Sequence, residues 1–257
     1  VLRMGGLVEQ HLDTAVEAII SGDSDLGLRV SNDDHKINRL EVDIDEECRK
    51  LLATRMPAAA DLRLIVMVIK TITDLERVGD EAAKIGYLAS HLATDRERYA
   101  SYSELKALGE HVQEMLHDAL DAFSRMDVDD ALAVIEEDKL VDEEYDQITR
   151  QCISLMMEDS RTIRRFMDVS WVARALERIG DHAKNIAEYV VYLVHGRDIR
   201  HTEREVVLQE LFGNTTGLKP HQARELRALY GRRTDRKMFV SPPLARAMTE
   251  LSRDTGR

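Results

Sequence analysis

Apolar residues recur along this chain at the spacing of amphipathic helices. Steps of three and four residues link Leu12, Val16 and Ile19 near the start, and the same steps return in a longer run from Leu105 to Phe123. None of the four prolines falls between Ala58 and Lys219, so nothing in that stretch forces a helix to break. The pattern predicts helices at about 1–20, 24–55, 58–91, 103–125, 128–159 and 161–195, with breaks expected near the starts of the second and the fifth.

The two halves of this helical region match each other. A shift of 104 residues aligns Gly5 with Gly109, Leu12 with Leu116, Asp23 with Asp127, Asp34 with Asp138, and Cys48 with Cys152. After a gap of three residues, Leu75-Glu-Arg-Val-Gly-Asp80 aligns with Leu176-Glu-Arg-Ile-Gly-Asp181. A match this long in one register indicates duplication of a three-helix unit. We therefore expect an all-α fold of two tandem three-helix bundles, related by internal duplication, with an extra C-terminal segment.

Three regions follow from this repeat. Residues 1–95 and 100–202 form the two predicted repeats, and a polar stretch between them marks the boundary. Residues 203–257 differ in composition, because they hold 11 basic against 7 acidic residues and three of the four prolines. This basic tail is predicted to be a separate segment, unrelated to the repeats or partly disordered.

Charge and cysteine content narrow the function classes. The 48 acidic residues outnumber the 36 basic ones, giving a net charge of −12, which argues against a nucleic-acid binder that relies on a broad basic face. Two cysteines in 257 residues do not make a disulfide framework. No apolar run approaches the roughly 20 residues of a membrane span, and no signal peptide is recognisable. The expected location is therefore the cytoplasm.

The most informative chemistry is a pair of oxygen-bearing side chains four residues apart on a helix, found four times. The pairs are Asp34 and Asn38, Glu76 and Asp80, Asp138 and Asp142, and Glu177 and Asp181. This spacing puts both side chains of a pair on one helix face, where like charges repel unless a cation lies between them. If the second and third helices of each repeat pack antiparallel, two pairs meet in each repeat. Oxygen ligands suit Mg²⁺, Mn²⁺ or iron better than Zn²⁺.

A plain structural interpretation competes with each of these hypotheses. Acidic pairs on a highly charged helix are commonly solvated faces. The repeated Arg77 and Arg178 either attract an anion such as phosphate or form salt bridges to a neighbouring helix. Gly79 and Gly180 cost helix stability, so they indicate close helix contact or space for a metal. The cysteines, Cys48 and Cys152, are expected in the core.

Enzyme classes find little support in the sequence. There is no Gly-x-Ser-x-Gly motif and no phosphate loop of the Walker type. A di-iron oxidase of the ferritin type needs two Glu-x-x-His motifs, and only Glu114-x-x-His117 fits. A carboxylate-bridged metalloenzyme, either oxidase or hydrolase, stays as the alternative to a non-catalytic regulator. A helical adapter whose acids are only solvated is the third hypothesis.

The two Leu-Glu-Arg-x-Gly-Asp helices, together with Asp34-x-x-Ile-Asn38 and Asp138-x-x-Val-Asp142, resemble the signature motifs of the PhoU family over about residues 1–202. The resemblance implies metal ions or clusters, often iron, held by these motifs. It also implies a non-catalytic negative regulator that relays the state of the phosphate ABC transporter, through its ATPase, to a phosphate sensor histidine kinase. Such a protein is expected to reach the inner membrane only through its partners, and we expect a homodimer or higher homo-oligomer.

The sequence departs from the family in three places. The family's first helix begins earlier, which implies a truncated N-terminus here. Lys84 stands where the second repeat has Asn185, which implies a weaker or differently liganded first site. Residues 211–257 instead resemble the opening segment of HflX-type GTPases, but no GTP-binding loop follows, so we infer no GTPase activity.

Overall fold

The structure is a computed structural model, and it describes residues 1–93 and 101–196. In these two stretches all regular elements are helical, which confirms the all-α prediction. The helices are α1 (Leu2–Ser21), α2 (Ser24–Asp33), α3 (His35–Arg55), α4 (Ala59–Leu92), α5 (Ser101–Arg125), α6 (Val128–Glu158), the short 3₁₀ helix η1 (Ser160–Thr162) and α7 (Ile163–His195). The basic tail and most of the predicted boundary between the repeats lie outside the described residues.

The same aspartate cap begins the second helix of each repeat. The Asp23 carboxylate accepts hydrogen bonds from the backbone N–H groups two and three residues further on, at 3.0 and 2.9 Å. Asp127 does the same for α6, at 3.0 and 3.2 Å. These bonds satisfy N–H groups that the first turn of a helix leaves without partners. The duplication seen in the sequence is thus a duplication of local structure.

One predicted helix break is confirmed and the other is wrong. The second predicted helix divides at Asp34, the N-cap of α3. The fifth does not divide, because α6 continues without interruption from Val128 to Glu158. Asp34 ends the run Asn32-Asp-Asp34, whose side chains compete with the backbone for hydrogen bonds, whereas its counterpart Asp138 follows two glutamates that favour helix.

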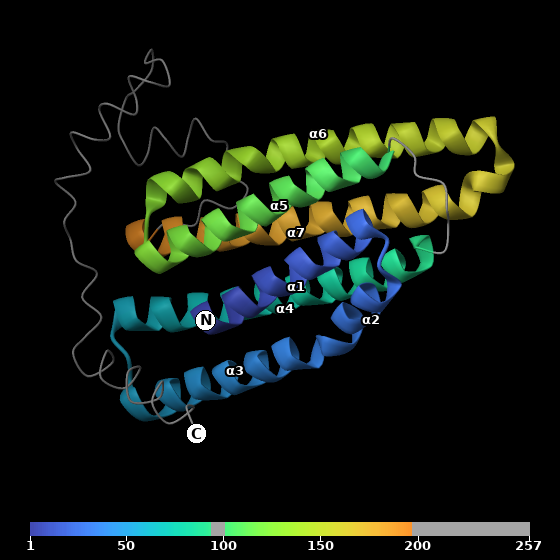
Figure 1. Cartoon of the computed structure of the whole chain (residues 1–257). Helices are drawn as coiled ribbons and strands as arrows, with labels where there is room; N and C mark the ends of the chain where they lie inside the picture. The colour runs from blue at the N-terminus through green and yellow to red at the C-terminus, as the bar shows by residue number, and fades with distance from the viewer. Residues whose placement is uncertain (94–100, 197–257) are drawn as a thin grey trace, which may run out of the picture.

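The helices pack as two neighbouring layers of the same design (Figure 1). In the first repeat α4 contacts α1, α2 and α3, and in the second repeat α5, α6 and α7 contact one another. The repeats join where α4 packs against α7 and where α1 packs against α5. Buried apolar side chains from both repeats form one core, which includes Phe166 and the free cysteines Cys48 and Cys152. The core position predicted for the cysteines is confirmed.

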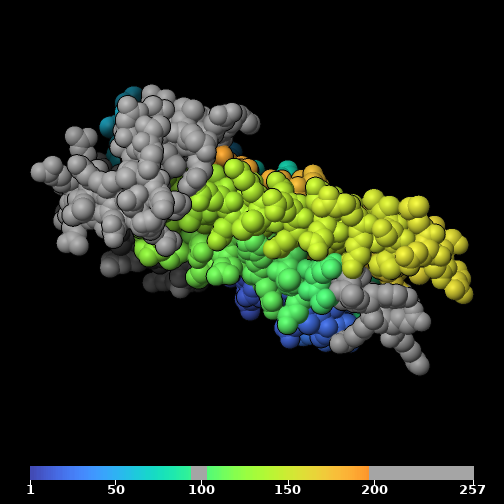
Figure 2. All heavy atoms as spheres, turned by 90° about the horizontal axis from the view of Figure 1, so that it is seen from above, coloured from blue at the N-terminus to red at the C-terminus, as the bar shows by residue number. Residues whose placement is uncertain are grey.

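The molecule is elongated, with α6 running along the face seen in Figure 2. The end of the hairpin formed by α6 and α7 projects beyond the neighbouring helices in both views. Among the helices that the structure describes, none has the length and apolar character needed to span a bilayer.

Candidate metal-binding sites

The first predicted set lies between α3 and α4. The Asn38 amide donates to Asp34 Oδ2 at 2.8 Å. The remaining side-chain oxygens of these two residues, Asp34 Oδ1 and Asn38 Oδ1, are buried and accept no hydrogen bond from the described residues. A buried oxygen without a donor is costly, and a cation is one way to satisfy it.

Glycine brings this pair against α4. A β-carbon added to Gly79 would lie 2.9 Å from the Ile37 side chain and 3.2 Å from Asp34 Oδ1. Contacts this short leave no room for a side chain, so Gly79 permits α3 to approach. The close contact predicted for Gly79 is confirmed. Glu76 and Asp80, on α4, flank this glycine in sequence.

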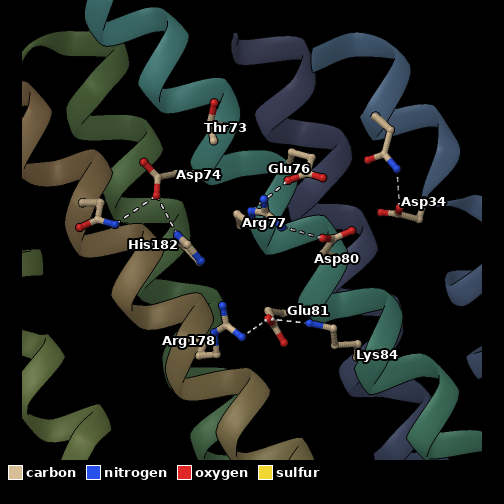
Figure 3. A network of polar contacts seen from close by, with 12 residues as sticks. Asp34, Thr73, Asp74, Glu76, Arg77, Asp80, Glu81, Lys84, Arg178 and His182 are labelled. Atoms are coloured by element: carbon tan, nitrogen blue, oxygen red, sulfur yellow. Dashed lines mark hydrogen bonds and ion pairs between the residues drawn. The ribbon is translucent and has the colours of Figure 1, made fainter. Parts of the chain in front are cut away.

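Charge repulsion is only partly relieved around Glu76. Its pKa is raised, first by partial burial and then by the nearby Asp80, with smaller contributions from Glu41 and Asp34. Arg77 offsets this, lying 3.5 Å from Glu76 Oε2 and 3.4 Å from Asp80 Oδ2 (Figure 3). The structure therefore brings Asp34, Asp80 and Glu76 into one electrostatic neighbourhood, and it adds Glu41, which the repeat comparison did not single out.

The second set lies between α6 and α7 and combines two buried acids with two exposed ones, Asp142 and Asp181. Asp138 and Glu177 are buried, with 4% and 8% of their surfaces exposed. The Lys184 ammonium contacts Asp138 Oδ2 at 2.5 Å, and Arg174 donates to Glu177 Oε1 at 2.6 Å. Glu177 Oε2 is buried and accepts no hydrogen bond from the described part of the chain. Gly180 again permits the approach, because an added β-carbon would lie 3.2 Å from the Val141 side chain.

The four acids of this second set perturb one another. The pKa of Glu177 is raised to about 7, first by burial and then by the nearby Asp181, with smaller contributions from Asp142 and Asp138 and with Arg174 opposing them. Partial burial, followed by the nearby Asp138, raises the pKa values of both Asp142 and Asp181. Four carboxyl groups held together at this cost repel one another, and a bound cation would lower that repulsion.

The donor chemistry fits a hard cation, but the side chains are not arranged as a ready site. Each set offers only carboxylate or amide oxygens. Over the two sets together, three of these oxygens are buried and accept no hydrogen bond from the described residues: Asp34 Oδ1, Asn38 Oδ1 and Glu177 Oε2. In the ranges that the structure describes, no group of three or more His, Cys, Asp or Glu side chains is already placed to hold a metal ion. Lys184, Arg174 and Arg77 instead neutralise the carboxylates. Loading a cation therefore requires these basic side chains to move aside.

A second polar cluster, between the repeats, was not found from the sequence. The buried Asp74 on α4 lies 2.7 Å from His182 Nδ1 and accepts a bond from the Asn185 amide at 3.1 Å (Figure 3). Two turns further along α4, buried Glu81 pairs with Arg178 at 3.0 Å and with Lys84 at 2.9 Å. The shift that aligns α4 with α7 places Ala175 opposite Asp74 and His182 opposite Glu81, so the repeat gives no signal for this cluster.

The contacts in this cluster show what the two repeated arginines bind and where Asn185 and Lys84 lie. The salt bridge to a neighbouring helix is confirmed for Arg178, whereas Arg77 pairs within its own helix. Asn185 and Lys84 belong to the contact between the repeats, in which they bind Asp74 and Glu81. Both partners lie outside the carboxylate sets, and the weaker or differently liganded first site stays a prediction.

The fold and its paired carboxylates define an all-α protein built from two duplicated helical bundles. The PhoU domain matches residues 1–89 and 105–190. The chain is 48% identical over 213 residues to the "Phosphate-specific transport system accessory protein PhoU homolog" of Pseudomonas aeruginosa, covering 83% of this chain and 88% of that protein. It is 48% identical over 201 residues to the PhoU protein of Escherichia coli K12, covering 78% and 83% respectively. The chain belongs to the PhoU family.

Two crystal structures of PhoU proteins have the same fold as this chain. The crystal structure of PhoU from Pseudomonas aeruginosa matches with a TM-score of 0.74 and 50% identity, covering 76% of this chain and 94% of that one. PhoU from Streptococcus pneumoniae, titled a phosphate transport system regulatory protein, matches with a TM-score of 0.71 and 29% identity, covering 77% and 92%. The relatives are named accessory or regulatory proteins, which confirms the expectation of a non-enzyme over the metalloenzyme alternative.

Proposed function

We propose that this chain is a negative regulator of phosphate uptake and of the phosphate-starvation response. It would act in the cytoplasm through contacts with the phosphate ABC transporter ATPase and the phosphate sensor histidine kinase, reaching the inner membrane only through them. Membership of the PhoU family is the observation that carries this proposal. The same likeness leads us to propose that the working form is a homodimer or higher homo-oligomer.

The proposal includes metal binding by both carboxylate sets. Asp34, Asn38, Glu76 and Asp80 would hold one site, and Asp138, Asp142, Glu177 and Asp181 the other. The buried oxygens without donors and the raised pKa of Glu177 support this assignment. A bound cation would supply positive charge that fixes α3 against α4 and α6 against α7. Iron, Mg²⁺ or Mn²⁺ fits such oxygen ligands better than Zn²⁺.

Metal content and signalling are tested separately. We expect purified protein from metal-replete cells to carry iron, manganese or magnesium in at least stoichiometric amounts by elemental analysis. The variant with Glu177→Gln and Asp181→Asn should lose that metal while keeping its helical circular dichroism. Glu143→Gln with Asp146→Asn, on the exposed side of α6, is the matched control. Equal metal content in both variants would contradict the assigned site.

The regulatory proposal has its own assay. In cells that lack their own PhoU protein, a phosphate-starvation reporter should be expressed even in high phosphate. Expression of this chain should repress the reporter, and we expect its repression to be lost in cells without the sensor kinase. A reporter that stays high when the chain is stably expressed would contradict the proposed function, whatever the metal content.

A further inference from the structure

The two carboxylate sets differ in the basic side chains that contact them. In the second set, Lys184 lies 2.5 Å from Asp138 and Arg174 lies 2.6 Å from Glu177. The side chains of these two acids are only 5% and 10% exposed, so water screens the ion pairs weakly. Each pair therefore holds a positive charge against an oxygen that an incoming cation needs.

The first repeat has no basic residue at the corresponding positions. The alignment of α4 with α7 places Thr73 opposite Arg174 and Ala83 opposite Lys184. Thr73, labelled in Figure 3, is exposed, and its hydroxyl donates to the backbone carbonyl of Ile69. Neither a hydroxyl nor a methyl group carries the charge that would neutralise a carboxylate. The acidic pairs thus recur in both repeats, whereas these two counterions do not.

Arg77 is the basic side chain beside the first set, and its contacts are longer. Its guanidinium lies 3.5 Å from the Glu76 carboxylate and 3.4 Å from the Asp80 carboxylate (Figure 3). The side chains of these two acids are 17% and 33% exposed, more than those of the paired acids in the second set. Longer contacts to more exposed carboxylates are weaker ion pairs, so Arg77 competes less with a cation.

The numbers of charges and of donor-free oxygens give the same ranking. Glu41 contributes to the raised pKa of Glu76, so with Glu41 the first set also has four carboxylates. These face one arginine, whereas the four of the second set face an arginine and a lysine. Two of the three buried oxygens that accept no hydrogen bond from the described residues also belong to the first set. A cation therefore displaces one basic side chain from the first set and two from the second.

We propose that the two sites are loaded in order, because Lys184 and Arg174 act as internal competitors in the second set: a divalent cation occupies the first set at a lower concentration. This inference rests on the metal binding included in the proposed function, and it adds the regulation of the two sites. The sequence difference at Lys84 left open a weaker or a differently liganded first site, and the counterions favour the second alternative. One protein then responds to two ranges of cation concentration.

Calorimetric titration of the full chain with Mn²⁺, after treatment with a chelator, measures the order directly. Each set is blocked in turn, the first by Glu76→Gln with Asp80→Asn and the second by Glu177→Gln with Asp181→Asn. We expect the protein with a blocked second set to bind Mn²⁺ at least tenfold more tightly than the protein with a blocked first set. Circular dichroism checks that both proteins keep their helices.

Exchanging the basic residues between the repeats tests the cause of this difference. Arg174→Thr with Lys184→Ala gives the second repeat the residues of the first. With the first set blocked, this exchange should tighten Mn²⁺ binding about tenfold. Thr73→Arg with Ala83→Lys makes the reverse exchange. With the second set blocked, it should weaken Mn²⁺ binding by a similar factor.

The control removes the same two charges elsewhere in the second repeat. Lys106 on α5 and Arg150 on α6 are exposed. Lys106→Ala with Arg150→Thr lowers the net charge as the first exchange does, but it leaves the contacts of the carboxylate sets intact. We expect this variant to bind Mn²⁺ at each set within about twofold of the unexchanged protein.

The possible failures point to different steps of the inference. Equal affinities of the two sets, or tighter binding at the second, would overturn the order of loading. An unchanged affinity after both exchanges would show that Lys184 and Arg174 do not compete for the carboxylates, and it would overturn the proposed cause. Absence of Mn²⁺ binding at both sets would contradict the metal binding on which the inference rests. The reporter assay in cells tests the regulatory function independently of these results.

Discussion

The Asp74 carboxylate on α4 lies 2.7 Å from Nδ1 of His182 on α7, and both side chains are largely buried where the two repeats meet. With Asn185 donating to the same oxygen, Asp74 connects the repeats through two contacts. Its loss would remove the partner of both His182 Nδ1 and the Asn185 amide where the repeats meet.

Asp74→Ala should therefore destabilise the protein by roughly 2–3 kcal/mol, because a buried charged hydrogen-bond partner is removed without replacement. Urea unfolding followed by circular dichroism measures this. Asp43→Ala, on the exposed side of α3, should change the free energy of unfolding by less than about 0.5 kcal/mol. Similar values for the two variants would show that Asp74 does not hold the repeats together.

Gly79→Ala tests the contact between α3 and α4. Alanine gains about 1 kcal/mol of helix propensity, but its β-carbon would meet Ile37 at 2.9 Å and the Asp34 carboxylate at 3.2 Å. Overpacking of this kind costs about 1–3 kcal/mol, so we expect a net loss of stability of about 1 kcal/mol. Thermal unfolding is the measurement. Gly6→Ala, on the same kind of helix but with nothing near the added atom, should instead stabilise by about 0.5–1 kcal/mol.

The raised pKa of Glu177 makes the stability of the folded protein depend on pH. Its folded-state pKa of about 7 lies above the ordinary value of 4.5, so the folded state holds its proton more tightly than the unfolded state does. This contribution to stability is fully present below pH 4.5 and is lost as the pH rises through about 7. The shift corresponds to an order of 3 kcal/mol.

In chelator-treated buffer, we therefore expect wild-type stability to fall relative to Glu177→Gln as the pH rises from about 4.5 to about 7. Urea midpoints at a series of pH values measure the difference. Glu143→Gln, which is exposed on α6, should track the wild type throughout. A difference between wild type and Glu177→Gln that stays constant with pH would refute a raised pKa at Glu177.

Lys184 competes with any cation for Asp138. Lys184→Met removes the ammonium that contacts Asp138 Oδ2 while keeping the aliphatic stem. We expect Mn²⁺ affinity at the second set, measured by calorimetric titration, to rise about tenfold or more, since one competing positive charge is gone. Lys139→Met, on the exposed side of α6, is the control. Weaker Mn²⁺ binding by Lys184→Met would show that Lys184 organises the carboxylates instead of blocking them.

Much of this fold could be predicted from local pattern. The periodicity of apolar residues gave the helices, and the matching aspartates Asp23 and Asp127 cap them in the same way. The predicted break in α6 is wrong because two glutamates, which favour helix, precede Asp138. Gly79 and Gly180 indicate close helix contact or space for a metal, because a glycine inside a helix costs stability, and the structure shows the close contact at both.

The sequence by itself determined the helices, their duplication and the acidic pairs, because each depends on neighbours a few residues apart. Only the tertiary structure decided that Arg178 binds Glu81 across the repeats and that Lys184 forms an ion pair with Asp138. It also decided that the side chain of Trp171 stays exposed. These contacts join side chains from different helices. Which partner a charge finds there depends on the distance between helix axes, and that distance is set by packing that no local pattern records.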